Sequence, residues 1–366
     1  MPARAQSPRE SAHAVGKSAG TVSPADPTVA PDWNRTIGAL GGATFFHTSN
    51  WANVLSQTYG FTPAYLWHIN DAGERSVMPA METSQWLFGR RGVSLPFTDE
   101  SPALLADAAA IRPLVDATLR QGASRAWTSW EFHGDRRSLG IEDAPASLSY
   151  FGHALALKGS SEELFAKIDG TARTAIRKAI NLGVSVEFSN ELADLRVFYD
   201  QLCRTRRKHG LPPQPFRFFT SIHRHALSAG HGTVAIARRG GIPVASAIFF
   251  HFGASAIYKF AASDPLARES QANHLVLWRA IERYAKDGFH RLDFGRTSRN
   301  NDGLRRFKLA WRPTEYDLDY TRYDFRREGF VAGGNERTTG WHTRVFRLLP
   351  PFVSRLIGAI AYKHMA

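Results

Sequence analysis

The sequence is poor in cysteine and short of acidic residues, and both shortages limit what the protein can be. Cys203 is the only cysteine among 366 residues, which excludes an internal disulfide framework and a cysteine-based zinc site. The 33 Asp and Glu residues face 46 Lys and Arg residues, so the formal net charge is +13. This surplus suits phosphates, nucleic acid or an anionic membrane, and it does not choose among them. A reducing compartment, the cytoplasm, is expected.

Long apolar runs are missing as well. The chain has no uninterrupted apolar stretch of about 20 residues, so no membrane-spanning helix is expected. Residues 1–30 lack the apolar core of about 7 to 15 residues that a secretory signal needs, and we predict a disordered, polar leader there. The remaining chain is rich enough in apolar residues, at 43% overall, to bury sizeable cores.

Residues 331–366 are predicted to form a basic, amphipathic tail. On a helix that begins near Pro351, the apolar residues at 352, 353, 356, 357 and 360 form one stripe. The same segment carries the cations Arg344, Arg347, Arg355 and Lys363. Through residues 344–364 such a helix can lie peripherally on an anionic membrane or dock on its own protein. The sequence leaves both alternatives open.

The length exceeds a typical domain of about 100 to 200 residues, and we predict two α/β (α+β) units. The first, 31–157, has two strands around the turn Asn70–Gly73, a helix over 102–121 and further strands. The second, 158–330, begins with the capping-box spacing of Ser160 and Glu163. Its predicted elements are two helices, a strand near 184–188, two helices, a three-stranded meander, a helix over 271–287 and a strand over 290–294.

Several motifs identify a family resemblance that spans roughly residues 45–325. They are, in order, FHTSNWANVLSQTYGFTPAYL, LFGRRGVSLPFTDE, GTARTAIRKAINLGVSVEF, YKFAASD, ANHLVLWRAIERYAKDGFHRLDFGRTS and GLRRFKLAW. With them the chain resembles the FemAB-like, or BioF2-like, branch of the GNAT acyltransferase superfamily. The resemblance implies two tandem GNAT-like domains, each a mixed, mostly antiparallel sheet flanked by helices. It also implies acyl or aminoacyl transfer to an amine or hydroxyl, often in exopolysaccharide or cell-envelope biosynthesis.

Two residues are predicted to be catalytic, Asp293 in DFGRTS and Lys308 in FKLAW. Asp293 follows a predicted strand, where it can orient a nucleophile or accept its proton, or merely satisfy backbone donors. In the same motif Arg296 can bind a phosphate or carboxylate in bidentate fashion, and Ser298 is a further substrate-binding candidate. Lys308 lies beside the apolar stripe of its helix. The resemblance implies that it contacts a phosphorylated acceptor or the charge that develops on the acyl carbonyl; a surface lysine is the alternative.

Further substrate-binding candidates come from the second unit. Arg173 and Arg177 stand at i and i+4 on one helix beside Lys178, and such like charges repel unless an anion lies between them. The resemblance implies that this helix lines the phosphate side of the groove; a solvated face is the alternative. Tyr258 in the meander is a further substrate-binding candidate.

The loop SDPLARESQAN runs from the meander into the helix over 271–287, and helix N-termini bind phosphates readily. The resemblance places the pyrophosphate loop of an acyl donor there, although the usual Arg/Gln-x-x-Gly-x-Gly/Ala signature is absent. We expect acyl-CoA as co-substrate and neither a tightly bound cofactor nor a metal. The candidates for binding the donor are Arg268, Ser270, Gln271, Asn273 and His274.

The sequence therefore predicts a cytoplasmic acyltransferase that acts on a glycan or lipid-linked precursor, with possible contact to the inner face of the cytoplasmic membrane. One alternative is an aminoacyl-tRNA-dependent ligase of peptidoglycan precursors, and tRNA is the one nucleic acid considered. The absent CoA signature favours this alternative, whereas the lack of a long heptad hairpin speaks against it. A second alternative is a non-catalytic module that binds glycan or lipid.

Overall fold

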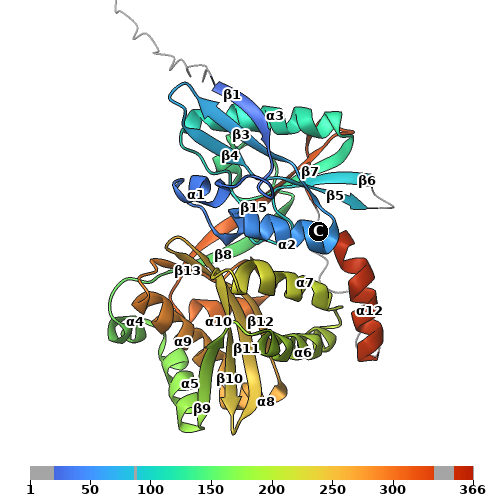
Figure 1. Cartoon of the computed structure of the whole chain (residues 1–366). Helices are drawn as coiled ribbons and strands as arrows, with labels where there is room; N and C mark the ends of the chain where they lie inside the picture. The colour runs from blue at the N-terminus through green and yellow to red at the C-terminus, as the bar shows by residue number, and fades with distance from the viewer. Residues whose placement is uncertain (1–19, 86–88, 334–349, 366) are drawn as a thin grey trace, which may run out of the picture.

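The computed structural model describes residues 20–85, 89–333 and 350–365 and has an upper and a lower lobe (Figure 1). Within these residues a 13-stranded sheet passes through both lobes in the order β2-β5-β6-β7-β15-β8-β13-β12-β11-β10-β9, with β14 and β16 attached at its sides. The fold is therefore α/β, as predicted, and its mixed sheet runs through both predicted units instead of forming one separate sheet in each.

The upper lobe is built from the first unit. A small antiparallel sheet of β1 (Gly20–Ala25), β3 (Tyr65–Asn70) and β4 (Arg75–Met78) lies over α3 (Ile111–Ser124). The predicted hairpin is confirmed, because the Asn70 side chain accepts hydrogen bonds across the turn between β3 and β4. The other elements of this lobe are α1 (Trp33–Gly38), α2 (Ser49–Tyr59), β2 (Thr62–Pro63), β5 (Met81–Gln85), β6 (Gly89–Val93) and β7 (Trp127–His133).

The lower lobe follows the predicted order of elements. The capping box of Ser160 and Glu163 starts its first helix. Its elements are α4 (Ser161–Lys167), α5 (Gly170–Asn181), β9 (Val184–Ser189), α6 (Leu192–His209), α7 (Phe216–Ile222), β10 (Gly232–Arg239), β11 (Ile242–Phe252), β12 (Ser255–Ser263), α8 (Pro265–Ser270), α9 (Ala272–Lys286), β13 (Arg291–Asp293), β14 (Thr297–Ser298) and α10 (Asp302–Leu309).

Both faces of the meander β10-β11-β12 are covered by helices (Figure 1). Successive side chains of a strand point to opposite faces, so Val234 and Ile236 pack with α6 and α7. Ala235 and Ala237 pack with α5 and α9. This double burial explains why the meander sequence is almost continuously apolar.

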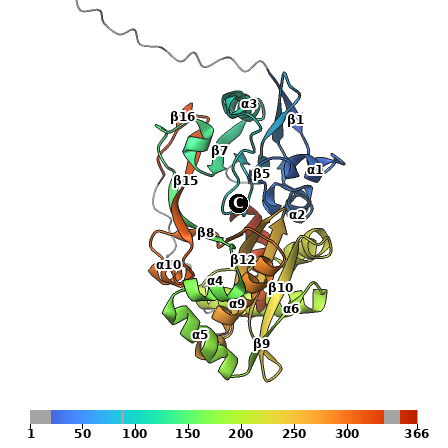
Figure 2. The same cartoon turned by 90° about the vertical axis from the view of Figure 1, so that its left-hand side faces the viewer.

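The two lobes are joined by strands that cross between them. β13 pairs with β12 in parallel only over Ser255–Ile257, and on its other side it pairs with β8 (Leu148–Ala156). After α10 the chain returns along β15 (Thr314–Asp324), which pairs with both β8 and β7 and carries β16 (Gly329–Phe330) (Figure 2). Residues from both predicted units therefore surround the end of β13.

The predicted disordered leader is wrong for its last part. Residues 20–25 form β1, because their backbone pairs with the edge of β3 over six positions. Residues 1–19 lie outside the described part of the chain. The helix predicted over 102–121 begins only at Ile111.

In the tail, α12 (Pro351–Ala361) confirms the predicted helix near Pro351. Arg344 and Arg347 of the tail lie outside the described residues. Among the described helices none is both long and apolar enough to cross a bilayer.

Candidate active site

A cavity of about 260 Å³ lies where the two units meet. The first unit supplies the loop around Thr44 and the loop of Asp99 and Glu100; the second supplies the beginning of β12 and the end of β13, and β15 adds one wall. The cavity thus has acidic and basic side chains as well as an apolar wall, which is typical of a substrate site. Its lining includes Gly42, Thr44, Phe46, Asp99, Glu100, Pro102, Gly152, Ser255, Ala256, Ile257, Arg291, Asp293, Gly295, Arg296, Tyr316 and Leu318.

Asp99 anchors the basic part of the cavity. Its carboxylate lies 2.9 Å from the Lys259 ammonium and 3.8 Å from the Arg296 guanidinium. Burial by itself raises the pKa of Asp99, but the two cations outweigh it and hold the pKa below its ordinary value. Burial lowers the pKa of Lys259, and the ion pair with Asp99 offsets only part of that effect. The cluster joins a loop of the first unit to β12 of the second.

Arg296, a predicted substrate-binding residue, is held by aromatic side chains. Its guanidinium lies 4.3 Å from the ring centre of Tyr150 and donates a 2.7 Å hydrogen bond to the Tyr320 hydroxyl. Tyr320 in turn donates to the Asp99 backbone oxygen at 2.6 Å. This packing fixes the guanidinium as a rigid cation in the cavity wall.

Lys308, a predicted catalytic residue, is 3% exposed and lies behind the cavity wall. Its ammonium donates to the backbone oxygens of Gly295 at 2.8 Å and Arg296 at 2.9 Å. Burial lowers its pKa to about 8, although Asp99 and Asp293 act in the opposite direction. Two of its three N–H donors therefore hold the turn that carries Arg296. The alternative of a solvent-exposed surface lysine is wrong.

Asp293, the other predicted catalytic residue, lines the cavity but is heavily engaged. One carboxylate oxygen accepts from the Gly295 backbone N–H at 2.7 Å, and the other pairs with Arg291 at 3.0 Å. Gly295 follows at φ +69°, in the left-handed region that suits glycine, and a Cβ there would lie 2.7 Å from Asp99 Oδ2. The engagement of Asp293 shapes the turn, so its carboxylate has little capacity left for a substrate.

Glu100 is the carboxylate with capacity left for a substrate. The Tyr316 hydroxyl, on β15, donates to Glu100 Oε2 at 2.8 Å and lies 3.5 Å from Asp293 Oδ2. Burial and the like charge of Asp293 raise the pKa of Glu100, and the Tyr316 hydrogen bond offsets only part of the rise. A carboxyl group with a raised pKa in a cavity is suited to accept a proton near neutral pH.

Two other predicted substrate-binding residues lie away from the cavity lining. Ser298 is half-buried in β14, where it pairs with Tyr150 of β8. Tyr258 stacks on Phe249 with ring centres 5.2 Å apart, on the face of the sheet that packs against α9. Side chains alternate along β12, so Lys259 rather than Tyr258 faces the Asp99 loop.

A second hollow, a groove of about 480 Å³, lies between one side of α5 and the beginning of α9. It brings together three predicted residues, Lys178, Gln271 and His274, beside Thr171 and Thr174. Gln271 precedes α9 at φ +55° and no side chain caps this helix start, although the His274 N–H already donates to the Gln271 backbone oxygen at 3.0 Å.

The remaining donor-binding candidates differ in their surroundings. Ser270 is buried, and its hydroxyl donates to the Leu266 backbone oxygen, so it is committed within α8. Arg268 is exposed and Asn273 is half-buried. The ring of His274 lies 5.1 Å from that of Phe307 on α10, the helix that carries Lys308, and burial lowers its pKa.

Arg173 and Arg177 line a third, open groove with Phe165 and Trp278, apart from Lys178. The Arg173 guanidinium donates to the backbone oxygens of Ala166 and Ile168 at the end of α4. Arg177 lies 5.5 Å from the ring centre of Phe165. The predicted three-residue basic cluster is thus divided between two grooves.

Several residues of the site were not singled out from the sequence: Asp99, Glu100, Arg291 and Tyr316, which line the cavity, and Tyr320, which holds Arg296. The adjacent acids in SLPFTDE, after a predicted strand, were the available signal for the first two. Among the described residues no group of three or more His, Cys, Asp or Glu side chains is placed to hold a metal.

Comparisons with known proteins agree with this architecture. Residues 166–309 match the acetyltransferase (GNAT) domain family Acetyltransf_6. The crystal structure of FemX aligns with a TM-score of 0.65 at 12% identity, over 81% of this chain and 96% of that chain. The structure of L-PGS from Bacillus licheniformis aligns at 0.51 and 12% identity, over 90% and 97% of the two chains.

The C-terminal domain of a putative lysylphosphatidylglycerol synthetase from Agrobacterium fabrum also aligns, with a TM-score of 0.51 at 15% identity, over 74% of this chain and 86% of that chain. At these identities the three structures show a shared fold. No curated protein matches the sequence significantly.

Proposed function

We propose that the chain, whose residues 166–309 match the acetyltransferase (GNAT) domain family, transfers an acyl group from a CoA-type thioester to an amine or hydroxyl acceptor. The acceptor is proposed to be a glycan or lipid-linked precursor of the cell envelope or of an exopolysaccharide. The observation that carries the proposal is the Glu100–Tyr316–Asp293 cluster in a cavity lined by both units.

In this reaction Glu100 accepts the proton of the acceptor. As the acceptor nitrogen or oxygen forms a bond to the acyl carbon, its proton passes to Glu100 and the carbon–sulfur bond of the thioester breaks. The thiolate leaves with the bonding electron pair and is then protonated. Glu100 suits this role because its pKa is raised, and Tyr316 orients its carboxylate.

The basic side of the cavity is proposed to stabilise negative charge. Arg296, fixed by Tyr150 and Tyr320, faces the cavity and suits a phosphate or carboxylate of the acceptor. Lys308 is proposed to act mainly through the backbone that it holds, which makes it a positioning residue.

The donor is proposed to lie with its phosphates in the groove between α5 and α9. The beginning of α9, which has no side-chain cap, is proposed to turn the positive end of its helix dipole toward the phosphates, and Lys178 adds a cation. The contact of His274 with Phe307 links this groove to α10 and hence to the Lys308 side of the cavity. The missing glycine-rich signature keeps an aminoacyl-tRNA as the alternative donor.

The proposal is tested by incubating the purified full-length chain with acyl-CoA or with aminoacyl-tRNA, in the presence of amino-sugar and lipid-linked acceptors. Mass spectrometry then identifies any acylated product. We expect product from acyl-CoA, and a loss of at least about 100-fold in turnover for Glu100→Gln. Glu142→Gln, at an exposed position of the first unit, is the matched control and should retain full turnover.

Each outcome decides between the candidate functions. Product from aminoacyl-tRNA alone would replace the donor assignment by the ligase alternative. Glycan or lipid binding without any product would favour the non-catalytic module. Turnover of Glu100→Gln within about twofold of the parent would refute the proton-acceptor role.

A further inference from the structure

Among its described side chains, the C-terminal helix α12 contacts the rest of the protein along one face. Its Arg355 forms a 2.8 Å ion pair with Asp200 of α6, and Tyr362, just after the helix, packs 5.4 Å from the Phe97 ring. Gly358 lies so close to the backbone of the loop before α7 that a Cβ would meet the Pro213 oxygen. These contacts fix which face of α12 turns inward.

The opposite face presents two large apolar side chains to solvent. Leu356 is 61% exposed and Ile360 is 63% exposed, and their spacing of four residues places them side by side on the helix. The contacts that dock α12 do not use them. Because the docking contacts already order α12, Leu356 and Ile360 are presented outward in fixed positions.

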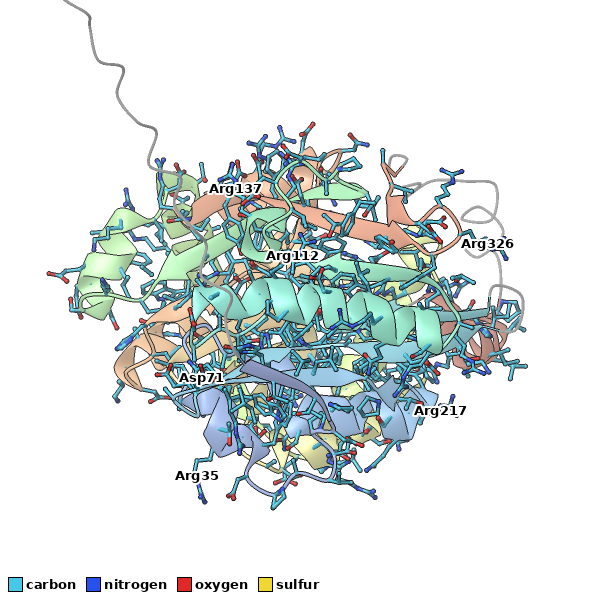
Figure 3. The ribbon with its side chains drawn as sticks, turned by 90° about the horizontal axis from the view of Figure 1, so that it is seen from above. Arg35, Asp71, Arg112, Arg137, Arg217 and Arg326 are labelled. Atoms are coloured by element: carbon cyan, nitrogen blue, oxygen red, sulfur yellow. The ribbon has the colours of Figure 1, made fainter. Side chains whose placement is uncertain are left out.

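Positive charge accompanies this apolar pair. The described residues 350–365 contain two cations, Arg355 and Lys363, and no acidic residue. Lys363 follows Ile360 by three residues and lies in the short 3-10 turn directly after α12. Arg206 lies 3.5 Å from the Tyr362 hydroxyl, and Arg217 of α7 points away from the ribbon (Figure 3).

We propose that the outer face of α12 is a docking surface for an anionic lipid bilayer. Apolar side chains beside cations match the boundary between acyl chains and negative headgroups. Two side chains are too small for a stable contact with another protein, which buries about 800 Å² on each partner. Docking through α12 does not depend on the proposed reaction. If both occur, docking would bring the cavity close to a lipid-linked acceptor.

The test is vesicle flotation of the full-length chain with phosphatidylcholine vesicles, with and without about 30% phosphatidylglycerol. We expect binding only to the anionic vesicles, and weaker binding as salt is raised. The double variant Leu356→Asn/Ile360→Asn should bind at least about tenfold more weakly. Val29→Asn/Ile242→Asn is the matched control, because it removes two apolar side chains elsewhere that are at least about as exposed.

The melting temperature of each variant shows whether α12 is still docked. Absence of wild-type flotation, or equal flotation of the two double variants, would overturn the proposal. Light scattering provides the other decisive outcome: a dimer that the Leu356→Asn/Ile360→Asn variant dissociates would assign this face to a second copy of the chain instead. The Leu356→Asn/Ile360→Asn variant should still acylate a water-soluble acceptor. This result would show that the variant has lost membrane binding and not catalysis.

Discussion

Replacement of Lys308 by methionine separates the chemistry of the candidate site from its stability. Methionine keeps the length and most of the volume of lysine but removes the charge and the two hydrogen bonds to the Gly295 and Arg296 backbone oxygens. We expect a small change in the free energy of unfolding together with a large loss of acyl transfer.

Two opposing effects set the expected stability change. Hydrogen bonds from a charged donor contribute about 1.5 to 3 kcal/mol each, so their loss costs about 3 to 6 kcal/mol. Against this, burial lowers the Lys308 pKa from 10.5 to about 8, and removal of the buried charge returns about 3 kcal/mol at neutral pH. The net loss should therefore lie between about 0 and 3 kcal/mol.

The shifted pKa of Lys308 also makes the stability of the protein depend on pH. Its pKa is lower in the folded protein than in the unfolded chain, so between about pH 8 and 10.5 the unfolded chain binds more protons. Stability then rises with pH across this window relative to Lys308→Met. The cost of the buried ammonium is fully present below about pH 8 and is gone above pH 10.5.

Urea unfolding of the wild type and Lys308→Met from pH 7 to 10.5 measures the difference directly, because other titrating groups are common to both. Turnover with acyl-CoA should fall by at least about tenfold, since the turn that carries Arg296 loses its support. Three results would each contradict this reasoning: a loss well above 3 kcal/mol, a stability difference that does not change with pH, or full turnover.

Three further predictions concern the same region and one helix end. Gly295→Ala should reduce turnover at least about tenfold, because φ +69° disfavours alanine and its Cβ would press on Asp99; a crystal structure with an unchanged Asp99 would contradict this. Tyr316→Phe removes the hydrogen bond that lowers the Glu100 pKa, so the acid limb of the pH–rate profile should move to higher pH, and an unmoved limb would exclude Glu100 as the group observed. Ser160→Ala should cost about 1 kcal/mol in urea unfolding without changing turnover, because the capping box lies outside the cavity.

Local sequence patterns predicted most of the lower lobe. The meander is recognisable because its strands are buried on both faces, and α9 is recognisable from its apolar spacing. β15 escaped prediction because TEYDLDYTRYD mixes charged and aromatic residues, and only pairing with β7 and β8 makes it a strand. β1 escaped for a similar reason, because pairing with β3 orders a polar segment.

The candidate site was predicted only in part. Asp293, Arg296 and Lys308 lie near one another in sequence, and they meet in the structure around one turn. Glu100 and Tyr316 are 216 positions apart, and no local pattern relates them. Their roles, like those of the predicted residues, stay proposals that the experiments above address.

The sequence by itself determined the α/β class, the order of elements in the second unit, the amphipathic helix near Pro351 and the family resemblance, because each depends on residues close together in the chain. Only the tertiary structure decided which charged groups are free to act. It engaged Asp293 with Arg291 and Gly295, buried Lys308 behind the turn and left Glu100 facing the cavity. The physical reason is that pKa and hydrogen-bonding capacity depend on burial and on neighbours from distant segments, which β8, β13 and β15 bring together.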